Sequence, residues 1–196
     1  VAGVAAGLKL QQLIDEGKIK AEEAVIGYVG AFSFAEVISG MTSYYLGARS
    51  VCPSVTMKVQ FVGSWSDPTL EAEAAKALID KGAVMISQHS DNTTPATTAQ
   101  ERGVFHTGYN NDMTGVAPKA SLLSCRIDWT NYFYTFIANY INGVENPSDY
   151  CGEMAKGEVV VTELNEAIAA PGTKEKLAEV EAKIASGEIQ VFDTST

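Results

Sequence analysis

Short apolar runs alternate with helical patterns along most of this chain, and this alternation constrains the fold more than any other feature. The first run, residues 24–30, contains no charged side chain, which is typical of a strand buried on both faces of a parallel sheet. Further strands are predicted at residues 55–62, 83–88, 104–109 and 121–126. Strands that alternate with helices favour right-handed βαβ crossovers, and the sequence therefore predicts an α/β fold with a doubly wound, mostly parallel sheet.

Helical patterns occur between most of these strands and again near the C-terminus. Helices are predicted at residues 1–14, 37–48, 69–81, 95–102, 132–140 and 173–186, and two more short strands at 158–162 and 189–192. Asp67 and Pro68 suit the N-cap and the first position of a helix, where an aspartate accepts a backbone N–H and proline loses no hydrogen bond. Thr94 and Pro95 are predicted to repeat this arrangement.

Composition and charge exclude several classes of protein. The 196-residue chain has a net charge of −10 and no cluster among its 14 Lys and Arg residues, which argues against a nucleic-acid partner. Its three cysteines are too few and too scattered for a disulfide framework or a zinc site. No apolar run reaches the roughly 20 residues of a membrane span. The first residues read as the middle of a helix without an initiator Met, so we expect the natural N-terminus to lie upstream.

Right-handed crossovers bring the polar turns that follow the five predicted strands to one edge of the sheet, where open α/β sheets bind ligands. The candidate ligand-binding residues in these turns are Phe32, Phe34, Trp65, Asp91, Asn110, Asp112 and Arg126. Aromatic rings supply stacking area, and carboxylates, amides and a guanidinium supply directed hydrogen bonds. This combination favours a flat, polar ligand such as a purine nucleoside or a sugar.

Several of these residues have a structural alternative. Phe32 and Phe34 point the same way in an extended turn, and we expect at least one of them to pack in the core. Asp91 and Asn92 form either an Asx-turn or ligand contacts. Arg126 ends an apolar strand and needs a partner, which is Asp112, Asp128 or a ligand oxygen.

The sequence gives little support for catalysis or for a cofactor. Ser90 follows His89 directly, and adjacent residues on an extended turn point apart, so they do not form a catalytic pair. His89, Asp91 and His106 lack the spacing of a helical metal motif. No glycine-rich phosphate loop is present, and we predict no metal, no cofactor and no enzymatic activity.

Several segments in order along the chain carry a resemblance to a known family. They are Val1-Ala2-Gly3-Val4-Ala5-Ala6-Gly7, Val25-Ile26-Gly27-Tyr28-Val29-Gly30, Val62-Gly63-Ser64-Trp65-Ser66-Asp67-Pro68, Lys81-Gly82-Ala83, Gly108-Tyr109-Asn110-Asn111-Asp112 and the tail 184–192. This succession resembles the basic membrane lipoprotein (BMP, PnrA-like) family. Its members are substrate-binding proteins of ABC transporters with the type I periplasmic-binding fold, and characterised members bind purine nucleosides.

The resemblance implies roles for individual residues. Trp65 stands where the family has an aromatic that stacks on the base, and Asn110 or Asp112 matches an acidic turn that binds ribose. Arg126 stands where the family often has a basic residue near the sugar. The turn 89–93 departs from the glycine-rich turn of many members, so ligand specificity is expected to differ there.

The resemblance also implies how the chain is divided. Residues 1–142 would form one Rossmann-like ligand-binding lobe, residues 143–157 a hinge or connection, and residues 158–196 a return segment that packs on a largely missing first lobe. The expected function is hinge closure on a purine nucleoside or similar small molecule, with an ABC transporter permease as partner. The expected location is extracytoplasmic, as a lipoprotein attached to the membrane only through a lipid anchor upstream. Alternatives are a sugar-binding relative, the effector-binding lobe of a transcription regulator, and an α/β enzyme that uses His89 and Asp91.

Overall fold

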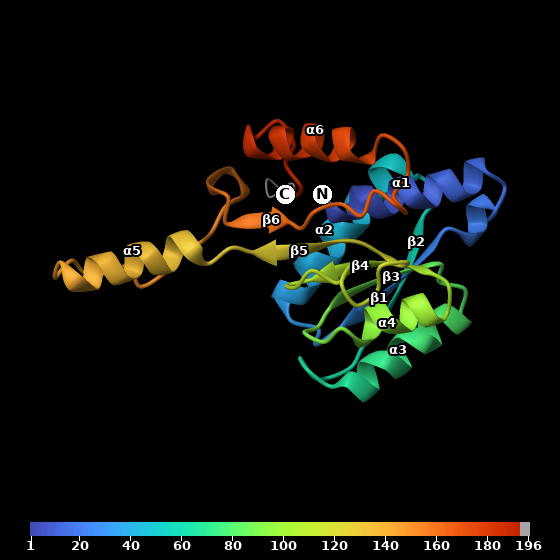
Figure 1. The fold of residues 1–196 in the computed structure, drawn as a ribbon, viewed down its shortest axis with the longest axis horizontal. Coiled ribbons are helices and arrows are strands. Elements are labelled where there is room, and N and C mark those ends of the chain that lie inside the picture. The colour runs from blue at the N-terminus through green and yellow to red at the C-terminus, as the bar shows by residue number, and fades with distance from the viewer. Residues whose placement is uncertain (193–196) are drawn as a thin grey trace.

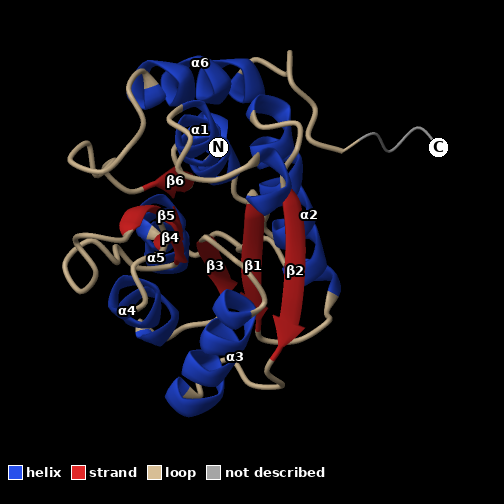
Figure 2. Ribbon diagram, turned by 90° about the vertical axis from the view of Figure 1, so that its right-hand side faces the viewer, coloured by secondary structure: helices blue, strands red, loops and turns tan. Residues whose placement is uncertain are grey.

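A six-stranded sheet in the order β2-β1-β3-β4-β5-β6 forms the centre of the protein, and the first five strands are parallel (Figures 1 and 2). The structure, a computed structural model, describes residues 1–192. The strands are β1 (Val25–Gly30), β2 (Thr56–Phe61), β3 (Met85–His89), β4 (Phe105–Tyr109), β5 (Ser121–Ile127) and β6 (Val159–Val161), of which β6 runs antiparallel to β5. The predicted α/β fold with a mostly parallel sheet is confirmed.

Helices cover both faces of this sheet. They are α1 (Ala2–Asp15), α2 (Ala35–Val51), α3 (Pro68–Asp80), α4 (Thr94–Glu101), α5 (Thr130–Ile141) and α6 (Thr173–Ala185), with short 3-10 turns η1 (Ala21–Glu23) and η2 (Met154–Lys156). In Figure 1, α3 and α4 lie on one side of the sheet, and α1, α2 and α6 lie on the other. Within the described residues, no helix combines the length and the apolar character needed to cross a bilayer.

The two faces of β1 explain why its sequence is apolar throughout. Ile26 and Tyr28 pack with α1 and α2 in one hydrophobic cluster, whereas Val25 and Val29 pack with α3 and α4 in the other. Successive side chains of a strand point to opposite faces. Both faces of the central strands are therefore buried, as in other doubly wound sheets.

Two local predictions about helix starts had different outcomes. The carboxylate of Asp67 accepts hydrogen bonds from the N–H groups of Thr69 and Leu70, each at 3.0 Å, which confirms it as the N-cap of α3. The prediction for Thr94 is wrong, because α4 begins at Thr94 itself and Thr93 at the N-cap makes no side-chain cap bond. Pro95 fits the second helical position, where its missing N–H still costs nothing.

The predicted strand at residues 189–192 is also wrong. The backbone N–H of Ile189 bonds the carbonyl of Lys183 at the end of α6, and its side chain packs against the cluster beneath α1 and α2. A strand needs a neighbouring strand for its hydrogen bonds, and none pairs with this segment among residues 1–192. Residues 193–196 of the predicted return segment lie outside the described residues.

The return segment packs on the central sheet and on α1 and α2. Strand β6 pairs with β5, and Leu177 and Val180 of α6 belong to the same hydrophobic cluster as α1 and α2. By contrast, α5 projects away from the body of the molecule and buries none of its residues (Figure 1). The division at residues 142 and 157 remains a prediction.

Candidate functional site

The carboxyl ends of the parallel strands meet at one edge of the sheet, and the predicted site residues lie there. Gly30, the last residue of β1, is paired with Phe61 of β2 on one side and with His89 of β3 on the other. The chain leaves β1 for β2 on one side and later returns to β3 on the other. This reversal opens a crevice at the carboxyl ends of β1 and β3, which is the usual ligand position in open α/β sheets.

Five aromatic rings follow one another along this edge, and we call them the aromatic row. The rings of Phe34 and Phe32 stack 4.8 Å apart at 9°, and Phe32 lies 5.8 Å from Trp65. Trp65 lies 6.1 Å from His89, and His89 lies 4.1 Å from Tyr109, all measured between ring centroids. The row therefore joins the turns after β1 and β2 to the last residues of β3 and β4.

The expectation that Phe32 or Phe34 packs in the core is wrong. Phe34 is 55% exposed and Phe32 is only half-buried. The two phenylalanine rings stack on each other, and the Phe32 ring is tilted by 59° against the Trp65 ring, because the turn after β1 lies beside the turn after β2. The row thus offers partly exposed ring faces to a ligand.

Hydrogen bonds also join the turn after β3 to the turns after β2 and β4. The Asn110 side-chain amide donates to the Asp91 carboxylate at 3.2 Å, and the Asp91 N–H donates to the carbonyl of Trp65 at 2.8 Å. Asn110 has a φ of 63°, a left-handed conformation that asparagine tolerates better than most residues. The structure therefore brings Trp65, Asp91 and Asn110 together, as the sequence predicted.

Asp112 and Arg126 lie further along the same edge. Together with Asn110 they line a polar hollow beside β5 and β6. One carboxylate oxygen of Asp112 accepts from the N–H and the hydroxyl of Thr114, so this side chain also shapes its own loop. Of the partners predicted for Arg126, Asp128 is the one observed: the Arg126 guanidinium lies 2.9 Å from the Asp128 carboxylate.

His89 lies between Trp65 and Tyr109 in the aromatic row and is buried. Its Nε2 atom has no hydrogen-bond partner among residues 1–192 and lies 3.9 Å from the Glu36 carboxylate. Burial lowers the pKa of His89, and Glu36 and Asp91 oppose this shift only in part, so the imidazole is neutral at pH 7. The Ser90 hydroxyl is fully buried and donates to Glu71 rather than to His89. His89 and Ser90 therefore do not form a Ser–His pair for nucleophilic chemistry.

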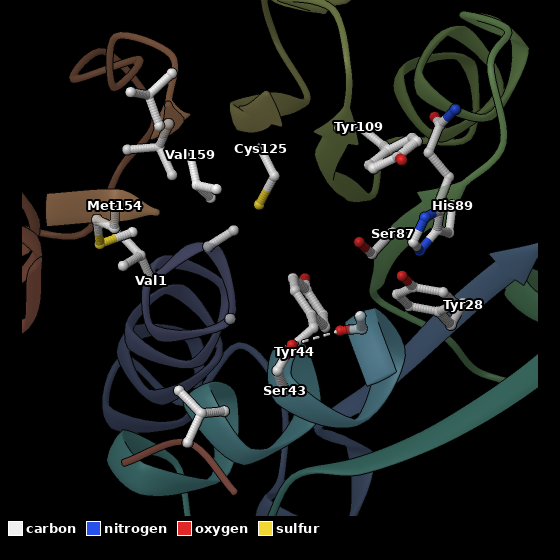
Figure 3. A pocket seen from close by; sticks show the side chains of 18 of the residues that line it. Val1, Tyr28, Ser43, Tyr44, Ser87, His89, Tyr109, Cys125, Met154 and Val159 are labelled. Atoms are coloured by element: carbon white, nitrogen blue, oxygen red, sulfur yellow. Dashed lines mark hydrogen bonds between the residues drawn. The ribbon is translucent and has the colours of Figure 1, made fainter. Parts of the chain in front are cut away.

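The inner end of the row borders a cavity of about 340 Å³ (Figure 3). Tyr28, His89 and Tyr109 line one end of it, and Val1 and Val159 line the other. Burial raises the pKa of Tyr109 to about 12, so its hydroxyl keeps its proton and can donate a hydrogen bond. No group of three or more His, Cys, Asp or Glu residues within 1–192 is placed to hold a metal ion.

Two contributors to the site, Tyr109 and Glu71, were not singled out from the sequence as binding groups. Tyr109 ends a predicted strand, and only the packing of neighbouring turns places its ring beside His89. Glu71 reads as a first-turn glutamate that favours the helix dipole, but it is fully buried. The proline-capped start of α3 was the available signal, since Glu71 lies one turn after Asp67.

Comparisons with known proteins identified similar sequences and structures. A family model described as ABC transporter substrate-binding protein PnrA-like matches residues 17–195. A purine-binding protein of Brucella abortus is 36% identical over 172 residues, covering 87% of this chain and 48% of that protein. A putative ABC transporter glucose-binding protein of Haloferax volcanii is 33% identical over 171 residues, covering 87% of this chain and 44% of that protein. The chain thus spans about half the length of these curated relatives.

Solved structures show the same fold at low sequence identity. An ABC transporter solute-binding protein from Aeropyrum pernix has a TM-score of 0.76 at 16% identity, covering 96% of this chain and 62% of that one. A transcriptional activator of the comK gene from Bacillus halodurans has a TM-score of 0.75 at 15% identity, covering 96% of this chain and 63% of that one. At such identities the likeness concerns the fold alone.

Proposed function

The chain belongs to the PnrA-like family of ABC transporter substrate-binding proteins, and from this premise we propose that it binds a purine nucleoside or a similar small molecule between two closing lobes. The aromatic row with the adjacent Asp91–Asn110 pair is the observation that carries the proposal. A planar base gains stacking area on the rings, and its edge meets carboxylate and amide groups. The purine-binding relative supports a base and the glucose-binding relative keeps a sugar as the alternative.

The charges at the edge favour a nucleoside over a nucleotide. Asp91, Asp112 and Glu36 are acceptors there, and the nearby cation Arg126 already pairs with Asp128. Carboxylates accept hydrogen bonds from ribose hydroxyls and exocyclic amines, whereas they repel a phosphate. An uncharged ligand rich in donors therefore suits this edge best.

The projecting segment of residues 129–157, which we call the arm, supports the two-lobe part of the proposal. No charged residue occurs from Trp129 to Val144, and Tyr134, Tyr140 and Ile141 are 78%, 79% and 76% exposed. Most of the large exposed side chains of α5 are aromatic or aliphatic, and an exposed apolar surface of this kind normally marks an interaction site. The chain leaves the lobe through β5 and returns through the antiparallel β6, where the Asp128 N–H donates to the Glu158 carbonyl.

We therefore assign residues 129–157 to an arm that docks on a first lobe, and the hinge to the β5–β6 pair at its base. This refines the expected division, in which residues 143–157 were the hinge and residues 158–196 met the first lobe. In the proposed mechanism a ligand that contacts both lobes stabilises the closed form, and an ABC transporter permease recognises that form. The proposed location is extracytoplasmic, with a lipid anchor upstream of this chain.

Replacing Trp65 by alanine should weaken nucleoside binding by the intact protein about 10- to 100-fold, since base–aromatic stacking is worth about 1–3 kcal/mol. Titration calorimetry measures the affinity, after a thermal-shift panel of nucleosides and sugars has identified the ligand. Phe105→Leu, which changes an aromatic residue at the opposite edge of the sheet, is the control. Unchanged affinity in the Trp65 variant would remove this residue from the site. Turnover of a nucleoside that is lost in His89→Ala would instead favour the enzyme alternative.

Replacing Tyr134 by aspartate should destabilise the intact protein by more than about 2 kcal/mol, because docking would bury an unpaired charge. In the described residues Tyr134 is 78% exposed, so an undocked arm would tolerate the change. Val116→Asp, at a 43% exposed loop position, is the matched control. Urea unfolding measures both variants, and equal small effects would contradict the docking of the arm.

A further inference from the structure

We propose that Glu71 is a positioning residue. It fixes the turn that carries Trp65 against the turn that carries Asp91, and so keeps the binding residues at this edge of the sheet, here called the binding edge, in the arrangement that a ligand needs. This inference rests on the proposed function for its effect on ligand affinity. Glu71 lies in the first turn of α3, behind the site, and its side chain is fully buried. It does not border the aromatic row, so its effect on a ligand is indirect.

Three donors from both turns converge on the Glu71 carboxylate. Its Oε1 atom accepts from the backbone N–H of Asp67 at 3.1 Å and from the side-chain amide of Asn92 at 2.8 Å. Its Oε2 atom accepts from the Ser90 hydroxyl at 2.8 Å. Asp67 comes two residues after Trp65, and Ser90 and Asn92 flank Asp91. One carboxylate therefore ties together the backbone on either side of both binding residues.

Few other hydrogen bonds join the two turns within the described residues. The direct link between them is the Asp91 N–H to the Trp65 carbonyl, and the Asn92 amide also reaches the Ser66 hydroxyl at 3.2 Å. The latter bond is longer and more exposed than the bonds to Glu71. Without the carboxylate, the Trp65 turn would keep one backbone bond and one weak side-chain bond to its neighbour.

A role in core packing alone would not require a polar side chain at this position. Glu71 has no ion pair with a Lys, Arg or His among residues 1–192. A buried carboxylate without a cation is costly, and a well-packed apolar side chain in its place is often more stable. The three donors compensate part of that cost. The same bonds hold the two turns together, which places the Trp65 ring beside His89 and the Asp91 carboxylate beside Asn110.

The test compares Glu71→Ala and Glu71→Gln in the intact protein with Glu73→Gln, an exposed glutamate on the same helix. Glutamine keeps one oxygen for the Asp67 N–H and the Asn92 amide, and its NH₂ group can donate to the Ser90 hydroxyl. We expect Glu71→Ala to weaken nucleoside binding by at least about tenfold and Glu71→Gln by less than about threefold. The Glu73 variant should bind like the unaltered protein.

A second readout needs no ligand. In a Trp129→Phe background Trp65 is the remaining tryptophan, and acrylamide quenching of its fluorescence reports how freely its turn moves. We expect quenching to rise in Glu71→Ala and to be restored by glutamine. If Glu71→Ala does not fold, Asn92→Ala removes one of the same donors and should increase quenching to a smaller extent.

The two readouts separate the possible failures. If no nucleoside binds the unaltered protein, the proposed function fails, while quenching still tests the tie between the turns. Equal quenching in the Glu71→Ala and Glu73→Gln proteins would overturn the inference, and so would weaker binding without any change in quenching.

Discussion

Lowering the pH from 7 to 5 should reduce the free energy of unfolding by about 2 kcal/mol, and the His106→Gln variant should lose most of this dependence. Burial lowers the pKa of His106 from its ordinary 6.5 to about 3. Between these two values the unfolded chain binds a proton that the folded chain excludes. The stability that the neutral His106 contributes is therefore present above pH 6.5. As the pH falls below 6.5, this contribution decreases by about 1.4 kcal/mol per pH unit, and the decrease levels off near pH 3.

The hydrogen bonds around His106 explain why the neutral ring fits. Both amide hydrogens of Gln88 are used, by the carbonyls of Ser90 at 2.9 Å and Asn92 at 2.7 Å. The Gln88 carbonyl oxygen therefore faces His106 Nε2 at 3.0 Å, and this ring nitrogen carries the proton. Nδ1 then accepts from the Ser121 hydroxyl, 3.3 Å away. A second proton on the ring would remove this acceptor in a fully buried place.

Urea unfolding at pH 7, 6 and 5 measures the effect. The chain has only two histidines, so few other side chains titrate in this range. His89→Gln is the matched control, because the pKa of His89 is also lowered by burial but is partly restored by Glu36 and Asp91. The control should keep most of the decline. An equal decline in His106→Gln and in the unaltered protein would contradict the assignment.

Strand positions could be predicted from the sequence because they depend on short-range patterns. The run 24–30 is apolar on both sides because both faces of β1 are covered. Its last residue, Gly30, is also the last residue of β1. The segment 189–192 has a similar apolar composition but no neighbouring strand among the described residues. Composition alone does not report whether a partner strand exists, so the prediction failed there.

Site residues were predictable to the extent that they follow strands. The turns that carry Trp65, Asp91 and Asn110 meet because the carboxyl ends of parallel strands lie at one edge of the sheet. This rule holds whichever side chains the turns carry. The roles of Tyr109 and Glu71 depend on which side chains of distant turns come into contact. Such contacts are set by register and by crossing geometry, and no local pattern encodes them.

The buried polar groups form a layer beneath the exposed site. Gln88 donates to the carbonyls of Ser90 and Asn92 from the strand side, and His106 in turn bonds the Gln88 side-chain oxygen. Glu71 accepts from the side chains of Ser90 and Asn92 from the helix side. In the proposed function the exposed residues contact the ligand, and this layer fixes their positions. Acid that protonates His106 should therefore loosen the binding edge before it unfolds the remaining lobe.

The contact between α1 and α2 should be the least tolerant of added volume, and Gly7→Ala should destabilise the protein by about 2 kcal/mol or more. A Cβ atom at Gly7 would lie 2.4 Å from the Ala48 carbonyl oxygen and 2.9 Å from the Ala48 Cα. These are backbone atoms, so no side-chain rotation relieves the clash and the helices must separate. The gain of about 1 kcal/mol from the helix propensity of alanine does not offset this cost.

The consequence of such a separation would reach the binding edge, because α2 supports it. The Thr107 hydroxyl on β4 donates to the Tyr44 hydroxyl on α2 at 2.7 Å, and Gly40 lies against the His89 ring. A displaced α2 would therefore disturb His89, which lies between Trp65 and Tyr109 in the aromatic row, and Gly7→Ala should weaken ligand binding as well as stability. Gly115→Ala is the control, since a Cβ atom there meets nothing within 4 Å and its φ is not positive. Urea unfolding and calorimetry measure the two effects, and a Gly7 variant as stable as the control would show that the helices can separate at little cost.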